Sequence, residues 1–374
     1  MKIAVNTRLL LKNRLEGIGQ FTFENLRRIT RQHSEQQFFF LFDRKYDESF
    51  VFSDNVTPIV AHPQARHPYL WYLFFEYGIP FQLRKIKPDL FLSTDGWIPT
   101  GLKIPTVNVI HDLNFLHHPE FVPPVVRRYY DRFFHKFARE ATRLATVSEF
   151  SRQDITTSFQ VPDEKIDVVF SGSNPAYRPF DEKQQSLVKQ RFTDGEDFFL
   201  FVGLIHKRKN LDNIFKAFDL FKESQDSPVK LVVVGDKKWW AGEIEDTYLQ
   251  MRHKDDVVML GRQPLDVVCE LTASTVAVLY ASLFEGFGLP IVDAFNAHVP
   301  VITSNVSAMP EIAGDAALIV DPTQPQQIAD AMNMLWMDNS LRDRLIENGK
   351  ARQSLFTWDR TADLLWRTIE KALP

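Results

Sequence analysis

An acidic side chain, a glycine-rich turn and a helix start lie close together in the stretch SLFEGFGLPIVDAF, residues 282–295. Gly286 and Gly288 let the backbone approach a ligand closely, and Pro290 suits the first turn of a helix. The free N–H groups of a helix start bind anions, so a diphosphate could lie there. Glu285, on the turn itself, could accept hydrogen bonds from ligand hydroxyls. The alternative is an ordinary turn with solvated acids, and these residues alone leave both interpretations open.

A second acid, Asp293, follows Glu285 by eight residues, which places it just over two helical turns further on. A carboxylate beside a phosphate site is repelled by the phosphate. We therefore expect Asp293 to accept a hydrogen bond from a hydroxyl of a second polyol, such as a ribose.

Two cations, Arg208 and Lys209, follow the apolar run FFLFVGL of residues 198–204. At the carboxyl end of a strand they could neutralise a diphosphate leaving group. The alternative is a solvated basic loop, which is the commoner fate of a run of charges.

Another apolar run, residues 106–110, ends at His111 and Asp112. A histidine at a strand end is more often structural than catalytic. Asp112 could orient His111 or cap the following turn, and the sequence leaves both open. Gly17 and Gly19 in GIGQ only superficially resemble a dinucleotide-binding fingerprint, because the preceding loop is long and Thr22 replaces the third glycine. They are either backbone contacts for a ligand or part of a helix start.

These residues must be positioned by two series of strands and helices. Near-continuous apolar runs indicate strands buried on both faces, as in parallel sheets, and helical patterns lie between many of them. The α/β pattern predicts two doubly wound, Rossmann-like sheets, whose ligand sites lie at the carboxyl ends of the strands. Such sheets facing each other would place the site in a cleft. The predicted strands occupy residues 2–7, 38–43, 89–94, 106–112, 144–149, 166–172, 198–204, 230–236, 257–262, 276–282, 300–305 and 317–322.

A cluster of Pro, Ser, Asn and charges at residues 171–186 marks the boundary between the two series. We predict an N-terminal domain over residues 1–178 and a C-terminal domain over 179–356. The remaining segment, 357–374, has the pattern of a helix and no strand after it.

Five separated blocks of this sequence resemble retaining glycosyltransferases of family 4, which have the GT-B fold of two facing Rossmann-like domains. Glu285 and Asp293 take the places of the two acids of the E-x(7)-E signature, with Asp for the second Glu. The resemblance spans nearly the whole chain and keeps the blocks in family order, which makes it specific. The blocks are residues 17–26, 109–121, 146–155, 201–214 and 307–322.

The resemblance implies a role for each candidate residue. Lys209 binds the donor phosphates with Arg208 beside it, and His111 lies near the donor sugar and helps position it. Glu285 contacts the sugar, and the last helix, 357–374, crosses back to the N-terminal domain. The remaining implied donor contacts are Gly17, Gly19, Gly286, Phe287, Gly288, Leu289 and Asp293.

Composition excludes several other classes of protein. The net charge of −4 gives no support for a nucleic-acid binder. The single cysteine, Cys269, rules out an intrachain disulfide, and no segment approaches the ~20 apolar residues of a membrane span. We expect a cytoplasmic location. There is no D-x-D motif and no Cys/His cluster with zinc spacing, so we expect neither a metal nor a cofactor besides the sugar nucleotide.

The segment 121–140 mixes five Lys and Arg residues with six Phe and Tyr residues. Such a helix can lie at an anionic membrane surface, which would make the protein peripheral to the inner membrane face. The spacing of Tyr130, Phe133 and Phe137 favours packing against the sheet instead. Both interpretations stay open.

We therefore predict a metal-independent hexosyltransferase of polysaccharide biosynthesis. It would move a hexose, with mannose from GDP-mannose as first choice, to a hydroxyl of a glycan or lipid-linked acceptor. The rivals are a nucleotide-sugar epimerase, a phosphorylase, and a non-catalytic sugar-nucleotide-binding protein. The sequence leaves open the donor base, sugar, acceptor, linkage and oligomeric state.

Overall fold

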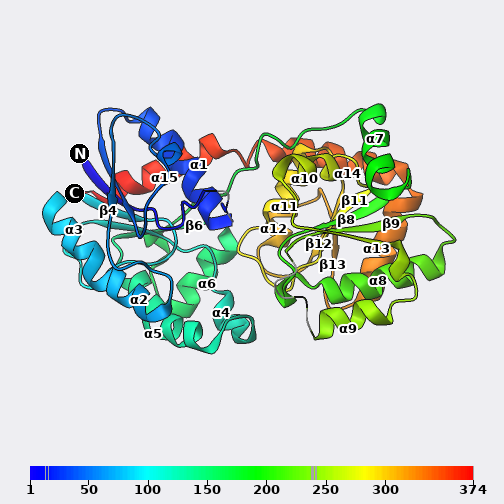
Figure 1. Ribbon diagram of the computed structural model, residues 1–374, viewed down its shortest axis with the longest axis horizontal. Coiled ribbons are helices and arrows are strands. Elements are labelled where there is room, and N and C mark those ends of the chain that lie inside the picture. Colours follow the sequence, from blue (N-terminus) through cyan, green and yellow to red (C-terminus); the bar gives the residue numbers. More distant parts are fainter. Residues whose placement is uncertain (13, 16, 237–239, 241, 374) are drawn as a thin grey trace. The chain divides into compact units, whose positions relative to one another are not determined.

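The computed structural model describes residues 1–373 apart from 13, 16, 237–239 and 241. The chain forms two compact units (Figure 1), Met1–Gly172 with Thr357–Pro374, and Ser173–Phe356. The division falls after Gly172, earlier than the predicted residue 178. The reason is local, because Ser173 and Asn174 already donate hydrogen bonds to a side chain of the second unit.

The first unit contains a seven-stranded parallel sheet in the order β3-β2-β1-β4-β5-β6-β7. Six of these strands are at predicted positions. The sequence analysis missed β3, whose Pro58 breaks the usual strand pattern. Proline is tolerated there because β3 lies at the edge of the sheet. The strands are β1 Lys2–Asn6, β2 Gln37–Phe42, β3 Val56–Val60, β4 Leu90–Ser93, β5 Thr106–Val109, β6 Arg143–Thr146 and β7 Ile166–Val168.

Helices cover this sheet, and the last helix of the chain belongs to this unit. α15 packs against α1 and β6, as Figure 1 shows for α1. Arg28 of α1 pairs with Asp359 at 2.6 Å, and the Thr361 hydroxyl donates to the carbonyl of Phe170 at 2.6 Å. The α-helices are α1 Gly17–Gln32, α2 Pro68–Leu73, α3 Ile79–Ile86, α4 Asn114–His117, α5 Pro124–Glu140, α6 Glu149–Phe159 and α15 Trp358–Ala372, with a π-helical segment η2 at Phe74–Gly78 and 3-10 turns η1 Glu48–Phe50, η3 Pro119–Phe121 and η4 Asp163–Lys165.

The helix predicted at 121–140 begins at Pro124 and packs one face inward. Phe137 is fully buried, whereas Phe133 and Tyr130 are only partly buried, and Tyr129 and Phe134 are buried beside Phe137. Core packing is therefore the main role of its aromatic residues, although the buried set is shifted from the predicted one.

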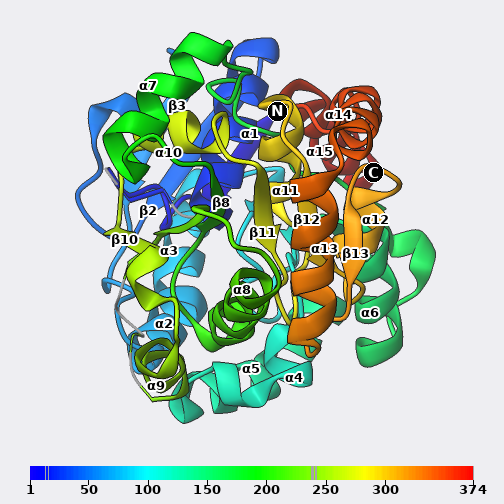
Figure 2. The same cartoon turned by 90° about the vertical axis from the view of Figure 1, so that its right-hand side faces the viewer.

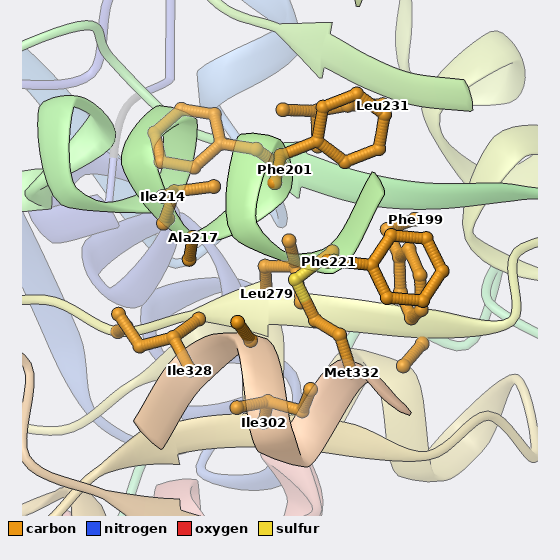
Figure 3. Close-up of a cluster of buried hydrophobic side chains, with 14 of the residues drawn as sticks. Phe199, Phe201, Ile214, Ala217, Phe221, Leu231, Leu279, Ile302, Ile328 and Met332 are labelled. Atoms are coloured by element: carbon orange, nitrogen blue, oxygen red, sulfur yellow. The ribbon is translucent and has the colours of Figure 1, made fainter. Parts of the chain in front are cut away.

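The second unit contains a six-stranded parallel sheet in the order β10-β9-β8-β11-β12-β13, with every strand at a predicted position. Its core is rich in phenylalanine: Phe199 and Phe201 of β8 meet Phe221 of α8 and Met332 of α13 (Figure 3). Figure 2 shows α8 and α13 side by side. The strands are β8 Phe198–Val202, β9 Lys230–Val234, β10 Val257–Gly261, β11 Ala277–Tyr280, β12 Val301–Ser304 and β13 Leu318–Val320. The helices are α7 Glu182–Thr193, α8 Leu211–Ser224, α9 Glu243–Gln250, α10 Leu265–Thr272, α11 Leu289–Asn296, α12 Met309–Ala313, α13 Pro325–Met337 and α14 Asn339–Gln353, with 3-10 turns η5 Lys207–Lys209 and η7 Lys254–Asp256.

Each sheet reverses its direction of winding at one point, between β1 and β4 in the first unit and between β8 and β11 in the second. Open parallel sheets bind ligands beyond the carboxyl ends of the strands at such switch points. The loops after β8 and β11 are therefore the expected ligand-binding loops of the second unit.

Candidate active site

The loops after β8 and β11 bring together three of the predicted site residues. Arg208 and Lys209 lie in the 3-10 turn η5, and Glu285 lies in the loop between β11 and α11. The Nζ atom of Lys209 is 2.6 Å from Oε1 of Glu285, and a guanidinium nitrogen of Arg208 donates to Oε2. Arg208 also donates to the carbonyl oxygen of Phe284 at 2.9 Å. Two cations thus share one carboxylate, and the cluster carries a net charge of about +1.

The electrostatics of this cluster are dominated by its ion pairs. Glu285 is only 7% exposed. Burial acts to raise its pKa, but the nearby charges and hydrogen bonds of Arg208 and Lys209 outweigh burial and lower the pKa to about 2. The carboxylate therefore stays ionised at neutral pH and holds both cations in place.

Four residues that sequence analysis did not single out position this cluster. The hydroxyl of Tyr280, the last residue of β11, accepts a hydrogen bond from Lys209 at 2.8 Å. The Ser307 hydroxyl accepts from the backbone N–H of Glu285 at 3.0 Å. The side chain of His206 caps η5 by accepting from the N–H of Arg208. Of the four, Ser307, His206 and Asn210 lie inside sequence blocks already quoted, so proximity to a motif is the signal that could have found them.

The fourth, Asn210, ties the loops to one another. Its amide donates to the carbonyl oxygens of Ala281 and Pro322 at 2.9 and 2.6 Å. The residue is buried and adopts a left-handed conformation with φ of 59°, which Asn tolerates better than most residues. Its contacts set the position of Lys209 relative to the loop that carries Glu285.

The glycine-rich turn leads directly into α11. Gly288 is the N-cap residue, with φ of 119°, a region that favours glycine. A Cβ atom there would meet Ile291 at 2.9 Å. Gly286 and Phe287 are buried with it, whereas Leu289 is half-buried and is already the first helical residue. The turn therefore needs glycine at 288 for its own conformation, whatever binds at the helix start.

Asp293 does not lie two helical turns from Glu285, as the spacing suggested. The helix begins only at Leu289, so Asp293 is in its second turn and residues 285–288 are not helical. Its carboxylate accepts from the Ser173 hydroxyl at 2.7 Å and from the N–H of Asn174 at 3.3 Å. Burial raises the pKa of Asp293 to about 7, although these hydrogen bonds act to lower it. Asp293 thus anchors the first residues of the second unit.

Asp293→Asn is expected to raise the Tm relative to the wild type at pH 8, with the difference vanishing toward pH 4. Burial places the pKa of the folded carboxyl at about 7, above its ordinary value of 3.8. Between these values the unfolded chain ionises while the folded chain keeps its proton, so wild-type stability falls as pH rises. The amide cannot ionise and still accepts from Ser173. Scanning calorimetry at pH 4.5 and pH 8 measures this; a Tm difference that does not change with pH contradicts it.

In the first unit, His111 lies just beyond β5. Its Nε2–H donates to the carbonyl oxygen of Thr94 at 2.9 Å, and its ring meets Phe21 edge-on at 4.9 Å. Burial lowers the pKa of His111, which favours the neutral ring. Asp112 accepts from the N–H of Asn114 at 3.0 Å, so of the two roles considered it performs the capping one. The role of His111 toward a donor sugar stays a prediction.

The two glycines of GIGQ occupy the first turn of α1. Gly17 is exposed and has open space around it. Gly19 is buried, and a Cβ atom there would lie 2.9 Å from the carbonyl oxygen of Leu9. Close packing explains Gly19, and a ligand contact by either residue stays a prediction.

Two family models account for most of the chain. The model described as Glycosyltransferase Family 4 matches residues 16–177, and the model described as Glycosyl transferases group 1 matches residues 182–352. The chain is a glycosyltransferase of family 4. The two matches are separated by residues 178–181, which lie a few residues after the division between the units, and the second match contains every residue of the Glu285 cluster. This glycosyltransferase has the GT-B fold that sequence analysis predicted.

Named relatives and a solved structure support this assignment. The glycosyltransferase is 25% identical over 360 residues to O-antigen chain mannosyltransferase B of Escherichia coli, covering 93% of this chain and 94% of that protein. It is 24% identical over 270 residues to O-antigen chain mannosyltransferase RfbU of Salmonella typhimurium, covering 72% and 71%. The crystal structure of HepE from Anabaena, in complex with UDP and glucose, matches its fold with a TM-score of 0.75 at 15% identity over 99% of each chain.

Two further observations concern metal ligands and membrane-spanning helices. Across the part of the chain that the structure describes, no three His, Cys, Asp or Glu side chains are grouped as metal ligands would be. In that same part, every helix is too short or too polar to cross a bilayer.

Proposed function

We propose that this glycosyltransferase transfers mannose from GDP-mannose to a hydroxyl of a glycan or lipid-linked acceptor, with retention of the anomeric configuration. The proposed binding of the donor rests on the cluster of Arg208, Lys209 and Glu285 at the switch point of the second sheet. The two mannosyltransferase relatives support the choice of sugar.

Each residue of the cluster has a distinct proposed role. Lys209 and Arg208 neutralise the diphosphate, whose charge grows as the glycosidic bond breaks. The helix start at Gly288 adds a favourable dipole for the same group. Glu285 contacts the hydroxyls of the sugar and keeps both cations in position. Asp293 accepts a hydrogen bond from the ribose, in exchange for one it now accepts from Ser173 or Asn174.

The proposed chemistry is a substitution on one face of the sugar. The bond from the anomeric carbon to the diphosphate oxygen breaks, the bond to the acceptor oxygen forms, and the acceptor proton passes to the departing phosphate. A double displacement would need a carboxylate nucleophile. The low pKa of Glu285 and its pairing with two cations make it a weak one. The same cations neutralise the negative charge of the departing phosphate, so the proposed reaction needs no divalent ion.

The donor is tested by thermal shift with GDP-mannose, UDP-glucose, ADP-glucose and dTDP-glucose. A ligand that binds the folded state raises the apparent stability by RT ln(1 + [L]/Kd), about 2.7 kcal/mol at a hundredfold excess over Kd. We expect the largest rise in Tm with GDP-mannose. A larger rise with another base would assign the donor to that base and leave the transferase reaction standing.

Stereochemistry and metal dependence test the mechanism. Proton NMR of the product should show the anomeric coupling of the donor, and transfer should continue in excess EDTA. An inverted product would contradict the proposed one-face substitution. Activity that EDTA abolishes and Mg²⁺ or Mn²⁺ restores would contradict it as well. Donor conversion without an acceptor would favour the epimerase, and a strict need for inorganic phosphate would favour the phosphorylase.

A further inference from the structure

The first sheet has a switch point of its own, to which the proposed chemistry assigns no ligand. It lies between β1 and β4, and open parallel sheets bind ligands beyond the carboxyl ends of the strands at such points. Arg8 lies two residues after β1, and Asp95 lies two residues after β4. The Nε–H of Arg8 donates to Oδ2 of Asp95 at 2.5 Å, so an ion pair joins the two strand ends.

The surroundings of Arg8 fix its orientation. Asp95 is itself held in place, because its Oδ1 atom accepts from the side-chain amide of Asn6 at 2.8 Å. The guanidinium carbon of Arg8 lies 4.8 Å from the ring centre of Trp97 and 5.4 Å from that of Phe75. The ion pair and the two rings therefore position Arg8 before any ligand binds.

Arg8 has unused hydrogen-bond donors although it is nearly buried. Its side chain is only 10% exposed. A guanidinium has five N–H groups, and the bond to Asp95 uses the one on Nε. Within the described ranges of the chain, the two terminal nitrogens of Arg8 have no hydrogen-bond partner. Donors that are positioned in this way and left unpaired indicate a ligand, because unpaired donors in a nearly buried group are costly.

Tyr130 of α5 presents a second free donor close to Arg8. Its ring meets the ring of Trp97 edge-on at 5.4 Å, and Arg8 lies over the same Trp97 ring. The charges of Arg8 and Asp112 both act on the Tyr130 hydroxyl, so both groups are near it. Burial raises the pKa of Tyr130 to about 12, which keeps the hydroxyl protonated. Among the residues that the structure describes, this hydroxyl has no hydrogen-bond partner.

The charge around these side chains favours a neutral ligand. Oδ1 of Asp112 accepts from the N–H of Asn114 at 3.0 Å, and Oδ2 has no partner in the described part of the chain. Asp95 neutralises Arg8, and burial favours the neutral ring of His111, so Asp112 leaves the group with a net charge of about −1. A phosphate or carboxylate would be repelled there. A sugar hydroxyl both donates and accepts hydrogen bonds, so it can bind Arg8 and Asp112 together.

We propose that Arg8, Tyr130 and Asp112 bind a neutral sugar of the acceptor. The terminal nitrogens of Arg8 donate to two of its hydroxyls, and Asp112 accepts from one. The inference rests on the proposed transfer to a glycan or lipid-linked acceptor and narrows the class of that acceptor. The enzyme recognises the acceptor at this position through sugar hydroxyls, and not through a phosphate or a uronic acid.

Saturation-transfer difference NMR of the full chain tests the site directly. It is carried out without nucleotide, so that the result does not depend on the donor base. The neutral probes are the methyl glycosides of mannose, galactose and N-acetylglucosamine, and the anionic probes are mannose 6-phosphate and methyl glucuronide. We expect saturation transfer to at least one neutral glycoside, with weaker binding of both anionic probes.

Titration of the bound glycoside then measures the contribution of each residue. Arg8→Lys keeps the charge beside Asp95 but loses the planar fork of donors, so the Kd should rise at least about tenfold. Tyr130→Phe removes one neutral donor, and the Kd should rise about fivefold. This variant should keep the wild-type Tm, because the hydroxyl has no partner in the described chain. It therefore tests the site even if Arg8→Lys fails to fold.

Two control variants separate this site from the rest of the protein. Arg31→Gln alters an exposed arginine in the last turn of α1. That turn lies at the opposite edge of the sheet, because α1 connects the parallel strands β1 and β2. Glu285→Gln alters the proposed donor-sugar contact in the second unit. Both variants should bind the glycoside as the wild type does.

The outcomes separate this proposal from the proposed function. Saturation transfer to none of the neutral glycosides overturns it, as does tighter binding of an anionic probe. Binding that Glu285→Gln weakens and Tyr130→Phe leaves unchanged places the glycoside in the donor site and also overturns it. If Arg8→Lys and Tyr130→Phe weaken sugar binding but the wild type transfers no sugar, the site stands and the proposed transferase reaction is wrong.

Discussion

Lys209→Ala is expected to lower kcat/KM for sugar transfer by on the order of 10²–10³ and to weaken donor binding. The ammonium of Lys209 is held by Glu285 and Tyr280, at 2.6 and 2.8 Å, so it is in place before any ligand arrives. A preorganised cation stabilises the charge that develops on the leaving diphosphate without reorganising in the reaction. Initial-rate kinetics with the donor varied measure the effect.

The neighbouring Lys207 provides a close control. It lies in the same 3-10 turn, but its side chain is exposed and pairs with Glu243 at 3.2 Å. Lys207→Ala should change kcat/KM by less than about twofold, because exposed ion pairs contribute little. If Lys209→Ala keeps wild-type kcat/KM, or if both variants lose the same amount, Lys209 is not part of the donor site.

Glu285→Gln is expected to abolish most turnover while leaving the affinity for the free nucleoside diphosphate unchanged or higher. The substitution removes the carboxylate charge shared by Arg208 and Lys209. Both cations are then left to the diphosphate, so its binding should not fall. The sugar loses a charged hydrogen-bond acceptor, and the cations lose the group that aligns them. Misplacement of catalytic groups by about 1 Å can cost on the order of 10² in rate.

Isothermal titration with GDP and initial rates with the intact donor measure these two effects separately. Glu243→Gln is the control, because this exposed acid pairs with Lys207 and lies outside the cluster. A fall in GDP affinity that matches the fall in rate would mean that Glu285 acts on the nucleotide and that the proposed division of roles is wrong. Unchanged turnover would remove Glu285 from the site altogether.

The positions of strands followed closely from the sequence, because their signal is local. The twelve predicted apolar runs are all strands in the structure. The strand that was not predicted, β3, contains Pro58 and lies at a sheet edge. The helix start at α11 was also predicted, since the glycines and Pro290 act on their own backbone. The predicted separation of Asp293 from Glu285, just over two helical turns, was wrong, because sequence spacing alone does not show that residues 285–288 lie outside the helix.

The sequence by itself therefore determined the two parallel α/β sheets, the family, and the presence of cations and an acid at strand ends. Only the tertiary structure decided how these side chains are paired. Lys209 and Glu285 are 76 residues apart in the chain yet share a hydrogen bond, because β8 and β11 are neighbours at the point where the sheet reverses. It also decided that Asp293 is bound by Ser173, and that Arg8 is paired with Asp95 and nearly buried. Partners and exposure depend on which distant segments fold together, and neither residue type nor spacing specifies that.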